Sequence, residues 1–207
     1  MRYLCLDTAY KYLSLSIIED NKIIAAYDEL CFKHQSEEIF VRLQELFESV
    51  NLKPLDIDAI CITKGPGSYT GVRIAMTLAK TICDITDIKL YTISTLKLYA
   101  NNQEDTLVLL DARSNRCYYG LFDKGEAKVE DTIYELDKVD LGNHNLVGDL
   151  SLFGKDDHYF KISECFLNNI NNFEEVENIS FFVPEYLKEN EEYLKWSEEW
   201  KLKILIE

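Results

Sequence analysis

The stretch that decides the fold is IDAICITKGPGSYTGVRIAMTLAKTI, residues 57–82. Its first seven residues are mostly apolar, which is typical of a buried strand. A compact loop with three glycines and a proline follows, and from about Gly71 to Ile85 apolar side chains recur at helical spacing. The segment therefore predicts a strand, a tight turn and a helix.

Upstream of this unit the sequence predicts a three-stranded meander and a helix. Apolar and β-branched runs, separated by short polar turns, place the strands at 2–8, 12–19 and 22–31. Between His34 and Val50, apolar residues recur at helical spacing opposite charged ones, which indicates an amphipathic helix. Downstream we expect a strand over 89–94 and a short helix over 95–100.

The second half of the chain begins like the first. YLCLDTAYKYLSLSIIEDNK (3–22) and LVLLDARSNRCYYGLFDKGE (107–126) share a strand that ends in Asp, a short turn, a second strand and a charged turn. Such a repeat indicates an internal duplication. The resulting prediction is an α/β protein with two mixed-sheet lobes and packed helices. We expect the N-terminal lobe at 1–102 and the smaller C-terminal lobe at 103–207, divided near the polar stretch NNQED.

Composition narrows the possible functions. The 207 residues are 47% hydrophobic, enough for a substantial core, and no apolar run approaches the roughly 20 residues of a membrane span. We therefore expect a soluble, cytoplasmic protein. The six scattered cysteines form no CxxC pair and predict buried thiols. A formal charge of -15 argues against direct binding of nucleic acid, because such binding relies on clustered Lys and Arg.

The loop before the second helix is the leading candidate for chemistry. The free N–H groups of a helix start can receive a phosphate, so Gly65, Gly67, Ser68 and Gly71, together with Asp7 and Thr8 at the end of the first strand, are candidate phosphate-binding residues. The loop has neither the GKS or GKT ending of a P-loop nor a dinucleotide fingerprint. The alternative is that the glycines let the helix approach the sheet closely.

Other catalytic arrangements are disfavoured. The three histidines form no HxxxH or HExxH pair, and no GxSxG elbow is present. We expect no catalytic residue, no metal site and no cofactor.

Six segments of the chain resemble the TsaB (also called YeaZ) family. They are KGPGSYTGVRIA at 64–75, LDTA at 6–9, ISTL at 93–96, LLDARSNRCYYGLF at 109–122, VGDL at 147–150 and VPEYLK at 183–188. They follow the family's order over nearly the whole chain. The resemblance implies the duplicated actin-like fold of the actin, sugar-kinase and heat-shock ATPase superfamily.

The resemblance also implies a function. The family belongs to the machinery that places a threonylcarbamoyl group on N6 of the adenosine beside the tRNA anticodon. Its catalytic subunit is the related TsaD, and a TsaE ATPase completes the bacterial set. The chain is thereby implied to be a non-catalytic scaffold that holds TsaD active, meets tRNA only through the complex, and pairs with itself when the partner is absent.

The second helix has two apolar faces, of which its own sheet can cover only one. Ile74, Leu78, Ile82 and Ile85 form the first face. The other must be buried by the first helix or by a second molecule, and small alanines on it would allow close approach. Since the resemblance implies pairing through the first two helices, the expected partner interface is Val72, Arg73, Ala75, Met76, Ala79 and Cys83.

Two further functions remain open at this point. One is a nucleotide-responsive or weakly ATP-binding actin-like protein that uses Asp7, Thr8 and the 65–71 loop. The other is a metallopeptidase-like enzyme, which rests on fold analogy alone. At the C-terminal end, Tyr193, Trp196 and Trp200 recur at near-helical spacing, which favours packing onto the domain over contact with a partner.

Overall fold

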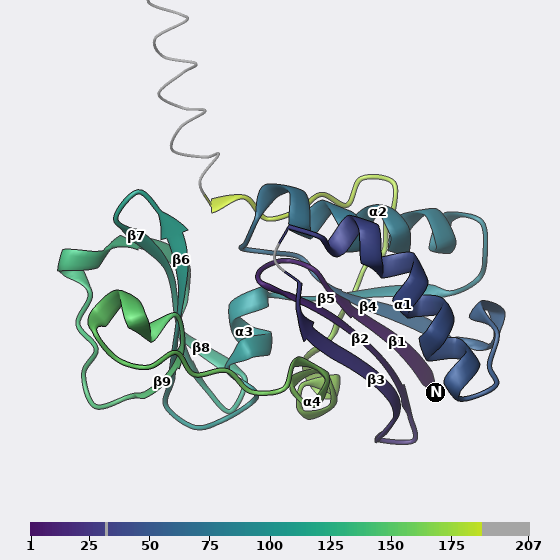
Figure 1. Cartoon of the computed structure of the whole chain (residues 1–207), viewed down its shortest axis with the longest axis horizontal. Coiled ribbons are helices and arrows are strands. Elements are labelled where there is room, and N and C mark those ends of the chain that lie inside the picture. Colours follow the sequence, from purple (N-terminus) through teal and green to yellow (C-terminus); the bar gives the residue numbers. More distant parts are fainter. Residues whose placement is uncertain (32, 188–207) are drawn as a thin grey trace, which may run out of the picture.

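A computed structural model describes residues 1–31 and 33–187 and shows two sheets side by side, with short helices between them (Figure 1). The first sheet has six strands in the order β10-β5-β4-β1-β2-β3, of which β10 (Glu174–Glu175) comes from near the end of the described chain. Along the chain, the elements of the first half are β1 (Arg2–Asp7), β2 (Tyr12–Glu19), β3 (Lys22–Leu30), α1 (Gln35–Ser49), η1 (Pro54–Asp56), β4 (Ala59–Thr63), α2 (Tyr69–Asp84), β5 (Lys89–Ile93) and α3 (Thr95–Tyr99). All of the elements predicted from the sequence in this half are confirmed, with ends that differ by at most two residues.

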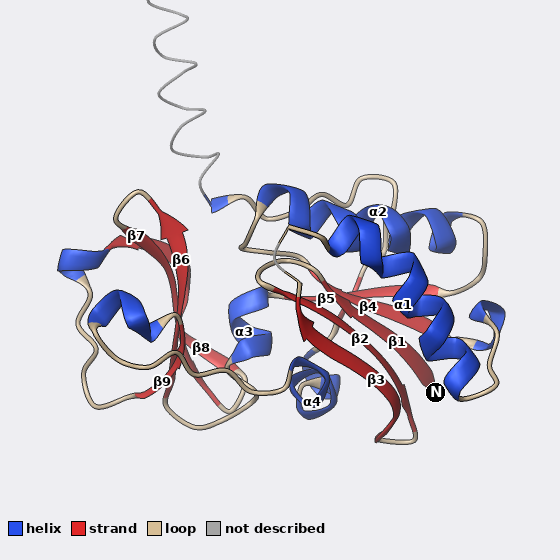
Figure 2. Ribbon diagram, in the orientation of Figure 1, coloured by secondary structure: helices blue, strands red, loops and turns tan. Residues whose placement is uncertain are grey.

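The first sheet combines an antiparallel meander with parallel strands. β1 pairs antiparallel with β2 and parallel with β4, and β4 pairs parallel with β5. Side chains alternate along β1, so Leu4 and Leu6 enter one core cluster whereas Cys5 enters another. The first cluster also contains the buried faces of α1 and α2, which cover one face of the sheet (Figure 2).

The second lobe repeats the arrangement of four strands of the first sheet. Its elements are β6 (Thr106–Arg113), β7 (Arg116–Asp123), β8 (Glu126–Glu135), η2 (Leu136–Lys138), β9 (Asn145–Gly148) and η3 (Leu150–Phe153). The sheet order is β8-β7-β6-β9, with β6 antiparallel to β7 and parallel to β9. This matches β3-β2-β1-β4, so the predicted duplication and the two mixed sheets are confirmed.

The division of the chain at 102/103 needs a correction, because the end of the described chain returns to the first lobe. The returning elements are α4 (Ile162–Asn168), η4 (Ile170–Asn172) and β10 (Glu174–Glu175). α4 packs on β1, β2 and β3, and β10 pairs antiparallel with β5. α3 and α4 thus fill the space between the two sheets, where the second core cluster joins residues of both lobes, such as Cys61 and Val108.

No helix within the described residues is long and apolar enough to cross a membrane. The aromatic residues Tyr193, Trp196 and Trp200 lie outside the part of the chain that the structure describes.

Candidate functional site

The glycine-rich loop between β4 and α2 packs tightly against the turn between β1 and β2. Ser68 is the N-cap of α2, and its Oγ accepts a hydrogen bond from the Gly71 N–H at 3.3 Å. A Cβ on Gly67 would lie 2.3 Å from the carbonyl oxygen of Ala9, and one on Gly71 would lie 2.3 Å from that of Thr8. Both contacts are far shorter than any side chain tolerates, so these two glycines are required for close approach of helix and turn.

Asp7 lies at the end of β1, fully buried and satisfied from within the chain. Its carboxylate accepts hydrogen bonds from the Ala9 N–H at 2.9 Å, the Thr63 Oγ1 at 2.7 Å and the Tyr99 hydroxyl at 2.7 Å. Burial raises the pKa of Asp7, which these donors partly oppose. Because Thr63 and Tyr99 are themselves buried, both oxygens of the Asp7 carboxylate are bonded inside the fold.

Thr8 is likewise fully buried, and its hydroxyl is used inside the fold. The Oγ1 donates to the carbonyl oxygen of Gly71 at 2.7 Å and accepts from the Ala75 N–H at 3.2 Å. A Cβ on Gly65 would lie 2.6 Å from the carbonyl oxygen of Glu185, so the segment around Glu185 covers this glycine. None of Asp7, Thr8 and Gly65 reaches an open surface in this structure, so their burial gives no support to the expected contact with a phosphate.

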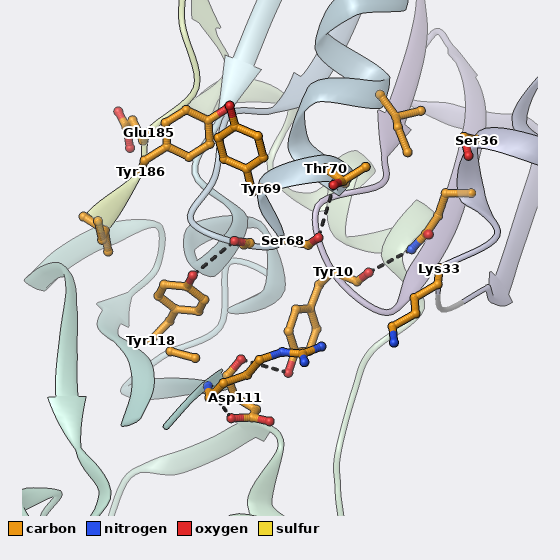
Figure 3. A pocket seen from close by; sticks show the side chains of 17 residues that line it. Tyr10, Lys33, Ser36, Ser68, Tyr69, Thr70, Asp111, Tyr118, Glu185 and Tyr186 are labelled. Carbon is orange, nitrogen blue, oxygen red and sulfur yellow. Dashed lines mark hydrogen bonds between the residues drawn. The ribbon is translucent and has the colours of Figure 1, made fainter. Parts of the chain in front are cut away.

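The remaining loop candidates line a cavity of about 440 Å³ between the lobes, at the start of α2 (Figure 3). This inter-lobe cavity is lined by Tyr10, Lys33, Gln35, Ser36, Gly67, Ser68, Tyr69, Thr70, Gly71, Ile74, Asp111, Ala112, Arg113, Tyr118, Glu185, Tyr186 and Leu187. Cationic and anionic groups are both present, and the Tyr118 hydroxyl donates to the carbonyl oxygen of Gly67 at 3.1 Å, which ties the loop to β7. Within the described residues, no three His, Cys, Asp or Glu side chains are grouped so that they could hold a metal ion.

A second hollow, of about 510 Å³, runs between α1 and α2. We call it the α1–α2 groove; it is lined by Ser36, Ile39, Phe40, Thr70, Arg73, Ile74, Thr77, Leu78 and Thr81. Phe40 is 65% exposed, which is unusual for so large an apolar side chain. The groove shares Ser36, Thr70 and Ile74 with the inter-lobe cavity, so the two hollows meet at the start of α2.

The expected partner interface on α2 must be corrected. Val72, Ala75, Met76, Ala79 and Cys83 are buried in the first core cluster against the sheet and cannot touch a second molecule. The small side chains of Ala75 and Ala79 bring the helix close to its own sheet, instead of to a partner helix. Arg73 alone of the six is exposed and lines the groove.

The opposite face of α2 is the accessible one. Ile74, Leu78 and Ile82 are only partly buried, and Ile85 is 79% exposed. The expected interface named no residue of α1, although pairing through the first two helices was expected. Phe40 follows the core residue Ile39 and lies about 100° further round the helix. Its side chain thereby leaves the core face and is exposed.

The folding pattern defines a class of protein. Both lobes contain a three-stranded meander joined to a parallel strand, and helices pack between them, which agrees with the duplicated actin-like arrangement expected from the sequence. A solved YeaZ-like protein from Pseudomonas aeruginosa has this fold, with a TM-score of 0.77 over 90% of this chain and 99% of its own, at 19% identity.

Sequence comparisons narrow the class to a family. The family model described as TsaD, tRNA N6-adenosine threonylcarbamoyltransferase, matches residues 14–142. A Bacillus subtilis protein named "tRNA threonylcarbamoyladenosine biosynthesis protein TsaB" is 33% identical over 64% of this chain, which spans 60% of that relative's length. The uncharacterised Mycoplasma genitalium protein MG208 is 30% identical over 90% of this chain and 94% of its own. The chain belongs to this TsaD-related family, among its TsaB (YeaZ) members.

Proposed function

We propose that this chain is a non-catalytic partner subunit of the enzyme that forms threonylcarbamoyladenosine in tRNA. In this proposal it docks through the α1–α2 groove onto a TsaD-like transferase and holds that subunit in its active form. The observation that carries the proposal is the groove itself, an apolar surface with an exposed aromatic ring, on a fold whose strand-end carboxylate, Asp7, is enclosed.

The composition of the groove suits a protein partner. Ile39, Ile74 and Leu78 line the groove with aliphatic side chains, and the exposed Phe40 adds an aromatic ring. Its polar lining comes from Arg73, serine and threonine side chains. An apolar centre with a polar rim is the usual layout of a specific interface. The groove is formed by two helices, so a helix pair from a related lobe could lie across it.

The descriptions of the matching family and of a relative support a role in this tRNA modification. The matching family model is that of the transferase, and the Bacillus subtilis relative carries the name of the tRNA modification. A formal charge of -15 disfavours direct contact with RNA, so tRNA would be met through the complex. A TsaE-like ATPase as third component, a cytoplasmic location and self-pairing in the absence of the transferase belong to the same proposal.

Two variants on neighbouring residues of α1 test the docking surface. Phe40→Asp puts a charge into the groove, whereas Val41→Asp puts the same charge on the same helix at a residue that is 52% exposed and does not line the groove. An aromatic hot-spot residue contributes about 2 kcal/mol or more, so Phe40→Asp should weaken binding to the transferase about thirtyfold or more. Val41→Asp should bind within about threefold of wild type.

The measurement is titration calorimetry with the transferase encoded in the same genome, with circular dichroism to establish that both variants are folded. Equal affinities of the two folded variants would refute the placement of the interface. Failure of the wild-type chain to bind would refute the partner role itself.

A second candidate function follows from the inter-lobe cavity, which is large enough for a small ligand and begins at the start of α2. A nucleotide-responsive role would use it. The enclosed carboxylate of Asp7 argues against a metal-bridged phosphate there. Titration of the isolated chain with ATP and magnesium decides between the two, since binding well below millimolar would favour the nucleotide role.

A further inference from the structure

One buried carboxylate joins the two lobes. Asp149 follows β9 and is 2% exposed. From its own half of the chain it accepts hydrogen bonds from the Asp111 N–H at 2.7 Å and from the Tyr159 hydroxyl. From the first lobe it accepts a hydrogen bond from the Tyr10 hydroxyl and forms an ion pair with the Lys11 ammonium group.

The four donors fully occupy this carboxylate. Burial, together with the neighbouring carboxylate, raises the pKa of both Tyr10 and Tyr159, so the two hydroxyls stay protonated and donate. Removal of one partner lowers the free energy of unfolding, because a buried charge or polar group is then left without its hydrogen bond or opposite charge. The turn that carries Tyr10 and Lys11 is therefore fixed from the second lobe.

The same turn holds the beginning of α1. The Gln35 Nε2, on the first residue of the helix, donates to the Tyr10 carbonyl oxygen at 2.9 Å, and the Cys31 N–H donates to the Lys11 carbonyl oxygen at 2.9 Å. Gln35 is buried, and the N-cap residue His34 makes no side-chain capping bond. In the part of the chain that the structure describes, the first turn of α1 is thus tied to the fold through the Tyr10–Lys11 turn.

The first turns of α1 form one wall of the α1–α2 groove through Ser36, Ile39 and Phe40. We propose that Asp149 is a positioning residue by which the second lobe fixes the first turns of α1, and hence the groove, in the geometry that docks the partner. The effect on binding rests on the proposed function. The mechanical link from Asp149 to α1 does not.

The test uses the full chain carrying Asp149→Asn, which removes the charge but keeps the size of the side chain. Hydrogen exchange of the backbone amides at 35–40 should become at least tenfold faster, while exchange in β4 stays unchanged. Affinity for the transferase should fall at least tenfold. Gln35→Met removes only the tether to Tyr10, keeps a side chain of similar length, and should reproduce both effects even if the Asp149 variant fails to fold.

Asp28→Asn is the matched control for a general loss of stability. Asp28 also accepts three hydrogen bonds, from the Ser14 Oγ and from the N–H and Oγ of Ser163 in α4, but has no described bond to the Tyr10–Lys11 turn or to α1. It should lower the urea midpoint without changing exchange at 35–40 or affinity.

Three outcomes decide the proposal. It is overturned if Asp149→Asn or Gln35→Met leaves exchange at 35–40 within twofold of wild type, or if the control weakens binding as much as they do. If exchange rises as expected but the wild-type chain does not bind the transferase, the link to α1 stands and the proposed function fails.

Discussion

Gly71→Ala tests whether the glycine-rich loop serves packing. A Cβ at this position would lie 2.3 Å from the Thr8 carbonyl oxygen, so α2 and the β1–β2 turn would have to separate by about 1 Å to restore ordinary contact. Thr8 cannot yield easily, because its hydroxyl bonds to the backbone of α2 at Gly71 and Ala75.

The magnitude follows from two opposed effects. Alanine in place of glycine inside a helix ordinarily stabilises by about 1 kcal/mol. Overpacking of a rigid contact costs about 3 kcal/mol, so the net loss should be about 2 kcal/mol, or about 4–8 °C in Tm for a chain of this size. The exposed neighbour Thr70→Ala lacks the steric contact and should change stability by less than about 0.5 kcal/mol.

The assay is urea unfolding followed by circular dichroism, with thermal melts in parallel. If the free energies of unfolding of Gly71→Ala and Thr70→Ala agree, the tight contact with Thr8 does not govern the loop. A loop kept for phosphate binding would then regain support.

Three more predictions concern Asp131, Tyr99 and the cysteines. Burial raises the pKa of Asp131 to about 6, above its unfolded value of about 3.9. The contribution of Asp131 to stability is therefore greatest below pH 4 and is lost as the pH rises through 6. Asp131→Asn should raise the free energy of unfolding in urea by about 1–2 kcal/mol at pH 7.5, but not at pH 4. Tyr99→Phe removes one donor from the buried carboxylate of Asp7 and should cost about 1–3 kcal/mol in urea unfolding, whereas an unchanged midpoint would contradict the enclosed site. In timed labelling with a thiol reagent, partly exposed Cys31 should react before the five buried cysteines, and early labelling of any other would contradict the core described above.

The sequence predicted the elements and the duplication well, because hydrophobic periodicity and turn residues are local signals. Each predicted strand in the first lobe lies within two residues of its observed bounds. The repeat of a strand ending in Asp also predicted matching sheet topologies correctly, since the pairing β1 with β4 recurs as β6 with β9.

The orientation of α2 could not be predicted in the same way. Periodicity identified two apolar faces but not which one meets the sheet, and that choice depends on how closely the helix approaches. Ala75 and Ala79 fit the short distance to the sheet, whereas the larger Ile74 and Leu78 remain at the groove. The return of α4 and β10 to the first sheet and the bonds from Thr63 and Tyr99 to Asp7 depend on long-range contacts, for which the local pattern carries no signal.

Reconstituted tRNA modification tests the central claim most directly. The transferase, a TsaE-like ATPase, threonylcarbamoyl-adenylate and tRNA are incubated with wild-type chain, Phe40→Asp, Val41→Asp or no chain, and modified nucleoside is quantified by mass spectrometry. The proposed function predicts product with wild type and Val41→Asp, and little with Phe40→Asp or without the chain. Equal product with and without the wild-type chain, or product from this chain when the transferase is omitted, would contradict the role of a non-catalytic partner subunit.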